Sequence, residues 1–256
     1  MISDTLSNAQ KYHFADFTFE HYRKLLRIAA ETHVFRLFSD YKEDENFAII
    51  RHDADYSMQA SRRIARIEKE EGVKSTYFVR LHSECYNLFE SKNVECLYDI
   101  VEMGHRVDLH FDPEFYGVDN HEDLIKYMEL EKRTLEDHFD LEVNAFTFHN
   151  PTASKVSAND QEYAGMINGW SPYFKDQVAY CSDSNGMWRF GRMEDFLLRS
   201  KDLPMQLLTH PEWWTEKAMS PREKIDLCIN GRAEWTRKFI DDFIVTKNGR
   251  EIIDWK

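Results

Sequence analysis

The sequence predicts an α/β fold with a mostly parallel sheet or barrel, and two observations lead to this expectation. Apolar, β-rich runs alternate along the chain with segments whose apolar residues recur at helical spacing, which is the pattern of repeated strand and helix units. Ionisable residues follow several of the apolar runs directly. These residues are Asp53 and Asp55, His110, His149, Asp183 and His210. Because parallel strands end at one face of such a fold, we expect these side chains to converge there.

The strand that organises the chain is expected at residues 47 to 53. Its apolar residues, Phe47 to Ile50, are typical of a strand covered on both faces. They lead into Arg51, Asp53 and, two residues further on, Asp55. Residues two apart share one side of an extended strand, and two carboxylates that close repel each other unless a cation or a proton lies between them. A capping loop with a salt bridge from Arg51 is the alternative explanation.

The other elements follow from periodicity and from capping residues. Further strands are expected at Val34 to Phe38, Ser75 to Val79, His105 to His110, Val143 to Phe148, Gln177 to Cys181, Met187 to Phe190 and Pro204 to Leu208. Helices are expected at Phe19 to Ala30, Ser57 to Glu70, Val94 to Met103, residues 121 to 139, Asn159 to Ile167 and Pro221 to Ile244. Thr18 is placed to cap the first helix, and Gly72 and Gly104 to end the second and third. Asp112 before Pro113 indicates one more helix start.

The length of 256 residues, without an internal repeat or a Pro/Gly-rich linker, favours a single domain. Within it, residues 1–46 are expected to form an N-terminal arm and helix, residues 47–214 the core, and residues 215–256 a C-terminal helix and tail. The polar first 16 residues are expected to be loosely tied.

Composition excludes several classes of partner. The net charge of -13 argues against nucleic acid and against an anionic membrane surface. No apolar run reaches the roughly 20 residues that span a bilayer. The segment Met1 to Thr5 does not begin a signal peptide, so a cytoplasmic location is expected. The four cysteines lack C-x-x-C spacing and are expected to be reduced thiols.

The histidines after the strands each allow two interpretations. His110 has carboxylates nearby and suits zinc or another divalent transition metal, or it is a hydrogen-bonded structural histidine. His149 before a turn reads as structural or as a ligand. His210 follows a run with no other ionisable group, and it is either buried and neutral or a general acid. Trp213 beside Trp214 is a core residue or a stacking wall for a sugar ring.

Together these blocks resemble the polysaccharide deacetylase superfamily, the NodB-homology fold of carbohydrate esterase family 4. Arg51-His52-Asp53-Ala54-Asp55 resembles the H-D-x-D variant of its first motif, and Gly104-His105-Arg106-Val107-Asp108-Leu109-His110 resembles its second. Asp183 and Trp188 loosely match the fourth motif, and Leu208-Thr209-His210 matches the fifth. The R-H-D-x-D and L-H-F-D blocks are closest to deacetylase-like proteins of bacterial surface-polysaccharide (O-antigen or capsule) gene clusters.

The resemblance implies a distorted (β/α) barrel and a metal-dependent hydrolase that removes an N-acetyl group from an amino sugar during surface polysaccharide biosynthesis. By the same resemblance Asp53 is the catalytic base and His210 the general acid. One divalent metal, expected to be zinc, is assigned to Asp55, His110 and His149. The residues assigned to the substrate are Asp183, Trp188, Arg189 and Trp213. The substrate class is an oligosaccharide, a lipid-linked sugar or a nucleotide-linked sugar.

The sequence departs from the family pattern at two places. Glu114 stands where the family has a second metal histidine, which makes Glu114 the alternative to His149 as third ligand. The stretch Phe146 to Pro151 lacks the arginine that orients the base in the family. These departures favour an alternative, a degenerate deacetylase that binds a sugar or a partner without turnover. A metal hydrolase acting on a cyclic amide or a phosphoester is a further alternative, which the few cations near the strand ends disfavour.

Overall fold

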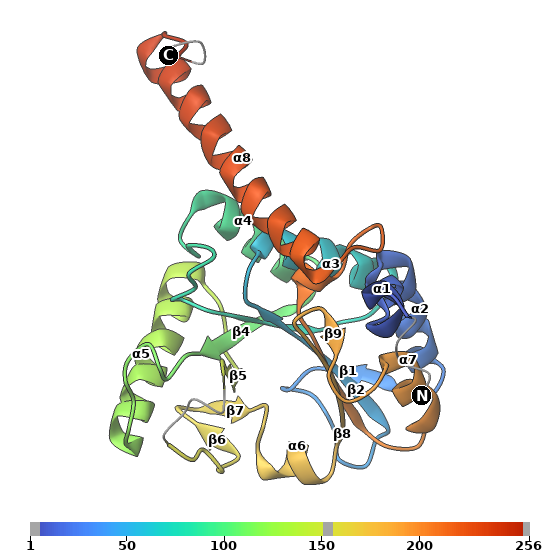
Figure 1. The fold of residues 1–256 in the computed structure, drawn as a ribbon. Helices are drawn as coiled ribbons and strands as arrows, with labels where there is room; N and C mark the ends of the chain where they lie inside the picture. The colour runs from blue at the N-terminus through green and yellow to red at the C-terminus, as the bar shows by residue number, and fades with distance from the viewer. Residues whose placement is uncertain (1–5, 151–155, 253–256) are drawn as a thin grey trace.

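The computed structural model describes residues 6–150 and 156–252, and it shows helices packed around a mostly parallel sheet (Figure 1). The predicted α/β fold class is therefore confirmed. The strand order is β6-β7-β5-β4-β3-β2-β10-β8-β9, with β1 added beside β2. Neighbours pair in parallel except in the hairpins β6–β7 and β8–β9. The two end strands, β6 and β9, do not pair with each other within the described residues.

The strands are β1 (Val34–Arg36), β2 (Phe47–Ala54), β3 (Thr76–Val79), β4 (Arg106–Phe111), β5 (Ala145–Phe148), β6 (Glu162–Tyr163), β7 (Met166–Asn168), β8 (Ala179–Ser184), β9 (Met187–Trp188) and β10 (Met205–Thr209). The α-helices are α1 (Asn8–Lys11), α2 (Phe19–Ala30), α3 (Met58–Glu70), α4 (Ser91–Glu102), α5 (His121–Phe139), α6 (Pro172–Asp176), α7 (Met193–Arg199) and α8 (Pro221–Asn248). Short 3-10 turns occupy Phe14–Phe17 and Pro211–Trp213. Most predicted elements agree with these bounds to within a few residues.

Two expected helices are absent from the structure. The segment predicted as a helix at Asn159 to Ile167 forms the β6–β7 hairpin, whose turn residues Ala164 and Gly165 have positive φ angles of 51° and 66°. No helix begins at Pro113 either. Asp112 instead accepts a hydrogen bond from the Glu114 backbone N–H, which closes a turn. A side chain that caps a turn and one that caps a helix look alike in sequence.

The N-terminal arm is held more firmly than its polarity indicates. Ser7 caps α1 with a capping box, and Asp16 is buried against Arg192 and the Trp188 indole. The expectation of a loose arm is therefore wrong for the described part of this segment. Met1 to Thr5 lies outside the described residues, and so does Pro151, which was expected to end the β5 segment.

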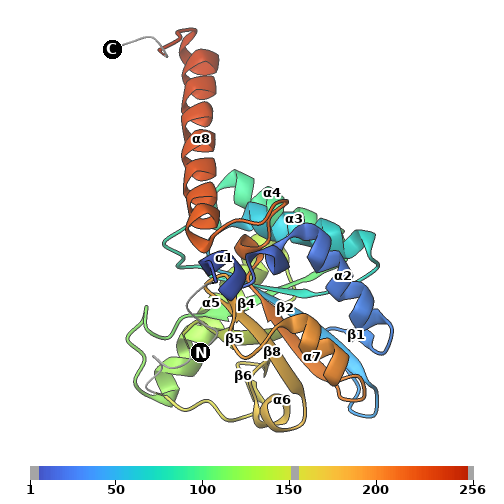
Figure 2. The same cartoon turned by 45° about the vertical axis from the view of Figure 1, so that its right-hand side comes forward.

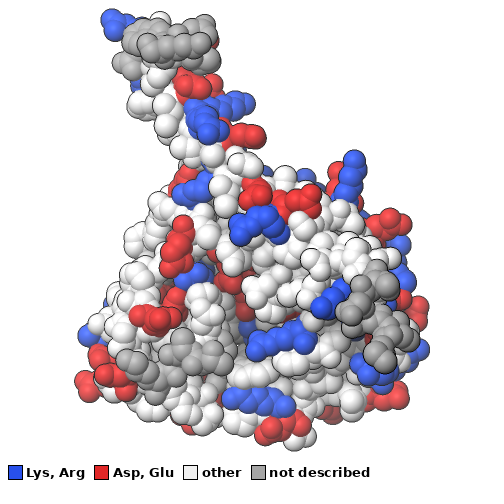
Figure 3. Space-filling model, viewed as in Figure 1, with Lys and Arg blue, Asp and Glu red and all other residues white. Residues whose placement is uncertain are grey.

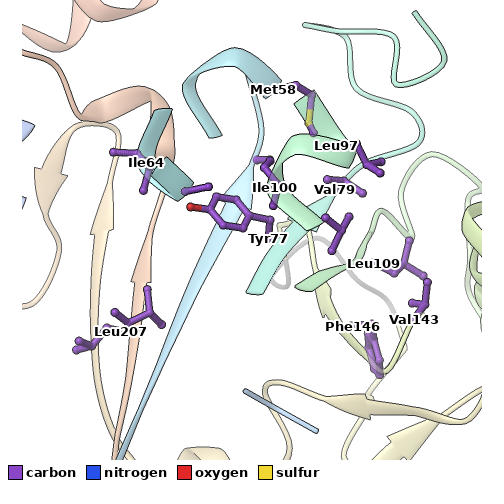
Figure 4. Close-up of a cluster of buried hydrophobic side chains, with 14 of the residues drawn as sticks. Met58, Ile64, Tyr77, Val79, Leu97, Ile100, Leu109, Val143, Phe146 and Leu207 are labelled. Carbon is purple, nitrogen blue, oxygen red and sulfur yellow. The ribbon is translucent and has the colours of Figure 1, made fainter. Parts of the chain in front are cut away.

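Strand β2 divides the core into two layers, because successive side chains point to opposite faces. All eight of its residues are buried. Ala48 and Ile50 join the large cluster that the helices cover, whereas Phe47 and Ile49 join a smaller cluster on the other face, with Phe38, Phe78, Ala145, Phe174 and Val178. Figure 4 shows part of the large cluster, where Tyr77 and Val79 of β3 meet Ile100 of α4.

A buried carboxylate lies inside the large layer. Glu68 of α3 is fully buried and accepts hydrogen bonds from the hydroxyls of Tyr22, Ser75 and Tyr77, each at 2.6 Å. His52 of β2 approaches it through Nε2 at 2.7 Å. Burial alone would raise the pKa of Glu68, but the neighbouring His52 and these hydrogen bonds lower it to about 2. The charge of Glu68 thus ties α2, α3, β2 and β3 together.

Helix α8 projects from the body of the molecule in both ribbon views (Figures 1 and 2). Several of its apolar side chains are exposed, including Phe239 and Phe243 at 51% and 50%. Within the described ranges, none of the helices combines the length and the apolarity that crossing a bilayer requires. The described cysteines, Cys85, Cys96, Cys181 and Cys228, are free thiols as expected.

We predict that Glu68 makes folding sensitive to acid. Its pKa is lower in the folded chain than the ordinary 4.5, so its contribution is present above pH 4.5 and is lost as the pH falls toward 2. A shift of this size corresponds to about 3 kcal/mol. The free energy of unfolding of Glu68→Gln, measured with urea, should be below that of the native chain at pH 7. The difference should shrink as the pH falls toward 3.

The matched control is Glu129→Gln, because Glu129 is exposed on α5. Its free energy of unfolding should follow that of the native chain at every pH. A Glu68→Gln deficit that is the same at pH 7 and pH 3 would contradict the role given to the Glu68 charge.

Candidate active site

A cavity of about 720 Å³ opens where β2, β4, β5, β8 and β10 end. Its lining includes every ionisable residue that the sequence places after a strand. These are Asp53, Asp55, His110, His149, Asp183 and His210. The parallel register explains the convergence, since β2 pairs with both β10 and β3, and β4 with both β3 and β5. The apolar residues Phe47, Ile49 and Phe78 lie on the same face as the cavity-lining Asp53 and close the layer below it.

Asp53 is held by an arginine from its own strand. Arg51 binds the carboxylate with two groups, Nε at 3.3 Å from Oδ1 and an Nη at 2.7 Å from Oδ2, and both side chains are buried. Burial alone would raise the pKa of Asp53, but the Arg51 guanidinium, with His110 and His210, lowers it to about 2. Asp53 is therefore an oriented carboxylate that stays ionised at neutral pH.

Asp55 lies between two imidazoles. Its Oδ1 is 3.6 Å from His110 Nε2, and its Oδ2 is 3.7 Å from His210 Nε2. The Oδ1 atom is buried and has no hydrogen-bond partner among the described residues. His110 Nδ1 is 2.8 Å from the Thr147 hydroxyl, which leaves Nε2 facing the two carboxylates. Burial lowers the pKa of His110, and a neutral imidazole is the form that binds a metal.

His210 is oriented by a buried carboxylate. Asp183 accepts two hydrogen bonds from it, one from the backbone N–H at 3.1 Å and a short one from the ring Nδ1–H. Burial alone would lower the pKa of His210, but the charge of Asp183 outweighs it and raises the pKa to about 10. His210 is therefore a cation at neutral pH, and its Nε2 proton faces the cavity. A carboxylate on one ring nitrogen fixes the tautomer in this way.

His149 has a similar arrangement on the other side of the cavity. Its Nδ1 is 3.0 Å from Asp112 Oδ2, and the same oxygen accepts a hydrogen bond from Arg80 at 2.8 Å. The ring centroid of His149 is 5.6 Å from that of His110. Glu114, the alternative third ligand, is exposed and does not line the cavity. Of the two candidates, only His149 is placed beside the other site residues.

The donor set at this site is suited to a divalent cation but is incomplete. The unpartnered oxygen of Asp55 and the Nε2 of His110 are the oxygen and nitrogen donors that zinc accepts. Within residues 6–150 and 156–252, however, no group of three or more His, Cys, Asp or Glu side chains is close enough together to hold an ion. Two donors are therefore in place, and the ring of His149, whose centroid is 5.6 Å from that of His110, is a candidate to complete the set.

The predicted substrate residues separate into two groups. Asp183 and Arg189 line the cavity, although the carboxylate of Asp183 already accepts hydrogen bonds from His210. Trp188 and Trp213 do not line it. The Trp188 indole donates to Asp16 and stacks on Phe17, and Trp213 is 4% exposed in the core. Trp188 is thus half-buried against the N-terminal arm and Trp213 is buried in the core, and neither side chain belongs to the lining of the cavity.

Several lining or supporting residues were not singled out from the sequence. Arg51 was seen only as a possible salt-bridge partner, although its two-residue spacing from Asp53 places both side chains on one face. Trp170 and Lys175 line the cavity from the segment around α6, for which the sequence predicts no element, and Tyr180 lines it from β8. Glu212 follows His210 and is buried, and neither of its carboxylate oxygens has a hydrogen-bond partner among the described residues.

Comparison with known proteins finds similar solved structures at low sequence identity. A family 4 carbohydrate esterase from Bacillus anthracis is 15% identical, with a TM-score of 0.43 over 83% of this chain and 86% of that one. A mutant CE4 family pseudoenzyme with restored enzymatic activity is 17% identical, with a TM-score of 0.43 over 76% and 65%. The chitin deacetylase of the fungal pathogen Colletotrichum lindemuthianum is 14% identical, with a TM-score of 0.39 over 72% and 81%.

No protein family model and no curated protein matches the chain. TM-scores below 0.5 at such identities do not establish an activity. The case for a function therefore depends on the residues that line the cavity.

We predict that Asp183 controls the charge of His210. Replacing Asp183 by Asn removes a negative charge but keeps an oxygen for the His210 backbone N–H. The pKa of His210, followed by NMR in chelator-treated protein, should then fall from about 10 toward its ordinary value of 6.5. The exposed Asp195 provides the control, since Asp195→Asn should leave the titration of His210 unchanged. An unchanged titration in Asp183→Asn would show that Asp183 does not set this pKa.

Proposed function

We propose that the protein is a metal-dependent hydrolase that removes the N-acetyl group from an amino sugar. The observation that carries the proposal is the pairing of opposite charges around one cavity. Asp53 is an ionised carboxylate held by Arg51, and His210 is a protonated imidazole held by Asp183. Amide hydrolysis needs a group that takes a proton from water and a group that gives one to the leaving amine.

The expected cofactor is one divalent ion, with zinc as the favoured metal. Asp55 and His110 would hold it together with His149. When bound, such an ion supplies Lewis-acid polarisation of the amide carbonyl and makes water more acidic. The Asp112 carboxylate at Nδ1 of His149 supports this assignment, because metal-binding histidines commonly give their other ring nitrogen to a carboxylate.

Asp53 accepts a proton from the attacking water in this scheme. Arg51 keeps the carboxylate ionised and fixes its orientation, so that Asp53 does not have to lose a proton before it acts. The water oxygen bonds to the acetyl carbon as the proton moves to Asp53. Burial of the pair excludes bulk water, which strengthens the electrostatic contacts at the reacting centre.

His210 donates the second proton. Its Nδ1–H remains on Asp183, and the Nε2 proton moves to the amine nitrogen as the carbon–nitrogen bond breaks. The products are acetate and the free amino sugar. Of the two protons of the water, one on Asp53 and one on the new carboxyl group, one restores His210 and the other is released to solvent. A raised pKa favours this role, since His210 is already protonated at the pH at which Asp53 is ionised.

A second candidate function is the binding of a sugar or a partner without turnover. It is favoured by the fact that no three-donor metal cluster is present within the described parts of the chain.

The proposed place in bacterial surface polysaccharide biosynthesis is supported by the resemblance of the R-H-D-x-D and L-H-F-D blocks. The content of bound metal separates the two candidates.

We predict about one divalent ion per chain in purified protein, measured by mass spectrometry of the metal. His110→Ala should lose the ion because it removes a direct donor, and His149→Ala should lose it if that ring is the third ligand. His138→Ala provides the control, since His138 lies on the exposed side of α5. Folded native protein without metal would favour the binder. Retention of the ion in His149→Ala alone would remove His149 from the ligand set.

We predict that Asp53→Asn lowers acetate release from N-acetylated amino-sugar substrates by roughly 10²- to 10⁴-fold, the usual contribution of a positioned base. Metal content should be largely retained, because Asp53 is not assigned as a ligand. The variant leaves Arg51 without its charged partner, so circular dichroism is needed to show that the chain is folded. Full activity in folded Asp53→Asn would exclude Asp53 as the base.

A further inference from the structure

We infer that the mouth of the cavity binds a phosphate group carried by the amino sugar, through Lys175 and Arg189. Both residues line the cavity, Lys175 from α6 and Arg189 from the residue after β9. The inference rests on the proposed function for the acetylated sugar itself. The phosphate is an addition that follows from the charges at the mouth.

The charged side chains in the deep part of the cavity are paired with opposite charges, whereas those at its mouth are not paired within the described residues. In the deep part, Asp53 is paired with Arg51 and Asp183 with His210. At the mouth, neither Lys175 nor Arg189 has an acidic partner or a side-chain hydrogen bond within the described residues. Arg51 also lines the cavity, but its guanidinium is already paired with Asp53. Two free cations in one cavity are therefore available to a negatively charged ligand.

Unpaired cations are notable in this molecule because the chain as a whole is acidic. The chain carries a net charge of -13, and many of its arginines lie against carboxylates, as Arg27 does with Glu71 and Arg36 with Glu45. Figure 3 shows Lys and Arg side chains near the middle of the viewed face as well as at its edges. In such an acidic molecule, free cations at a cavity mouth offset the repulsion that an anionic substrate would otherwise meet.

Aromatic rings connect the two cations. The Lys175 ammonium is 6.0 Å from the Trp170 ring centroid, and the Arg189 guanidinium is 5.3 Å from that of Phe190. Tyr180 lies between these rings, with its centroid 4.7 Å from Trp170 and 6.4 Å from Phe190. The mouth is thus an aromatic row with a cation at each end. Cation–π attraction holds each charge near its ring without neutralising it.

This geometry favours a phosphate ester over a neutral sugar. The row offers flat apolar surface to a sugar ring or a base, and the two cations can each donate charged hydrogen bonds to phosphate oxygens. A phosphate or diphosphate carries about two negative charges where a carboxylate carries one, so it gains more from a nearby cation. The ligand class is therefore an N-acetyl amino sugar linked to a phosphate or a diphosphate. The phosphate can come from a nucleotide or from a lipid carrier.

The test is binding by calorimetry, with N-acetylglucosamine, N-acetylglucosamine 1-phosphate and its uridine diphosphate ester as probes. The phosphorylated probes should bind at least about tenfold more tightly than the neutral sugar, and added salt should reduce the advantage. Lys175→Met and Arg189→Met should each weaken the phosphorylated probes by about three- to tenfold more than they weaken the neutral sugar. Equal binding of the phosphorylated and neutral probes to the native protein would overturn the inference.

Matched controls remove a cation elsewhere. Lys201→Met and Arg66→Met each remove one positive charge from an exposed residue that does not line the cavity. They should leave all three affinities unchanged. If they weaken the phosphorylated probes as much as Lys175→Met and Arg189→Met do, the effect is one of net charge and the inference fails.

The outcome is separable from that of the proposed function. Binding is measured without turnover, so a phosphate preference lost in the two mouth variants supports the inference even if no probe releases acetate. Acetate release from neutral and phosphorylated sugars at the same kcat/KM would support the deacetylase and overturn the phosphate site. A short prenyl diphosphate ester of the sugar, compared with the uridine ester, then identifies the carrier. Tighter binding of either ester than of the neutral sugar supports the shared phosphate site.

Discussion

The structure depends on one constraint, which is that one of its fully buried strands carries ionisable residues. Strand β2 is buried along its whole length between β10 and β3, yet it includes Arg51, His52 and Asp53. A buried charge is tolerated only when it has a partner. Because side chains alternate along a strand, these ionisable residues separate onto two faces. Asp53 meets Arg51 on the cavity face, and His52 meets Glu68 on the helix face.

The two pairs have different surroundings on the two faces of β2. On the helix face the ring of His52 bridges Glu68 and the Thr209 hydroxyl, so the charge is enclosed and contributes to holding the layers together. On the cavity face the pair stands above an apolar layer that includes Phe78, and the Arg51 guanidinium lies 5.6 Å from that ring. The base of the cavity is therefore a packed apolar layer that supports the Arg51–Asp53 pair. Asp55, just beyond the end of β2, keeps a buried carboxylate oxygen that has no hydrogen-bond partner among the described residues.

The sequence predicted the parts of the site that depend on strand ends. Asp53, Asp55, His110 and His210 follow apolar runs, and the rule that parallel strands end together brought them to one cavity. The sequence did not predict the parts of the site that depend on loops. Lys175 reaches the mouth through a five-residue helix, and the hairpin turn at Ala164 and Gly165 was hidden in a segment with helix-like spacing. Loop geometry is set by tertiary packing, which local periodicity does not record.

The two ion pairs of the cavity act in opposite directions on groups that face the same space. Arg51, with smaller contributions from His110 and His210, lowers the pKa of Asp53 to about 2, and Asp183, with Asp55 and Glu212, raises the pKa of His210 to about 10. Without these partners a carboxylate and an imidazole this near would have pKa values about 3 units apart. Separation of the two values keeps the Asp53 carboxylate ionised and the His210 imidazole protonated across the neutral range, as their proposed roles of base and acid require. Environments that push the pKa values of two titratable groups apart are how a site distinguishes an acid from a base, and here Arg51 and Asp183 are the main neighbours that push them apart.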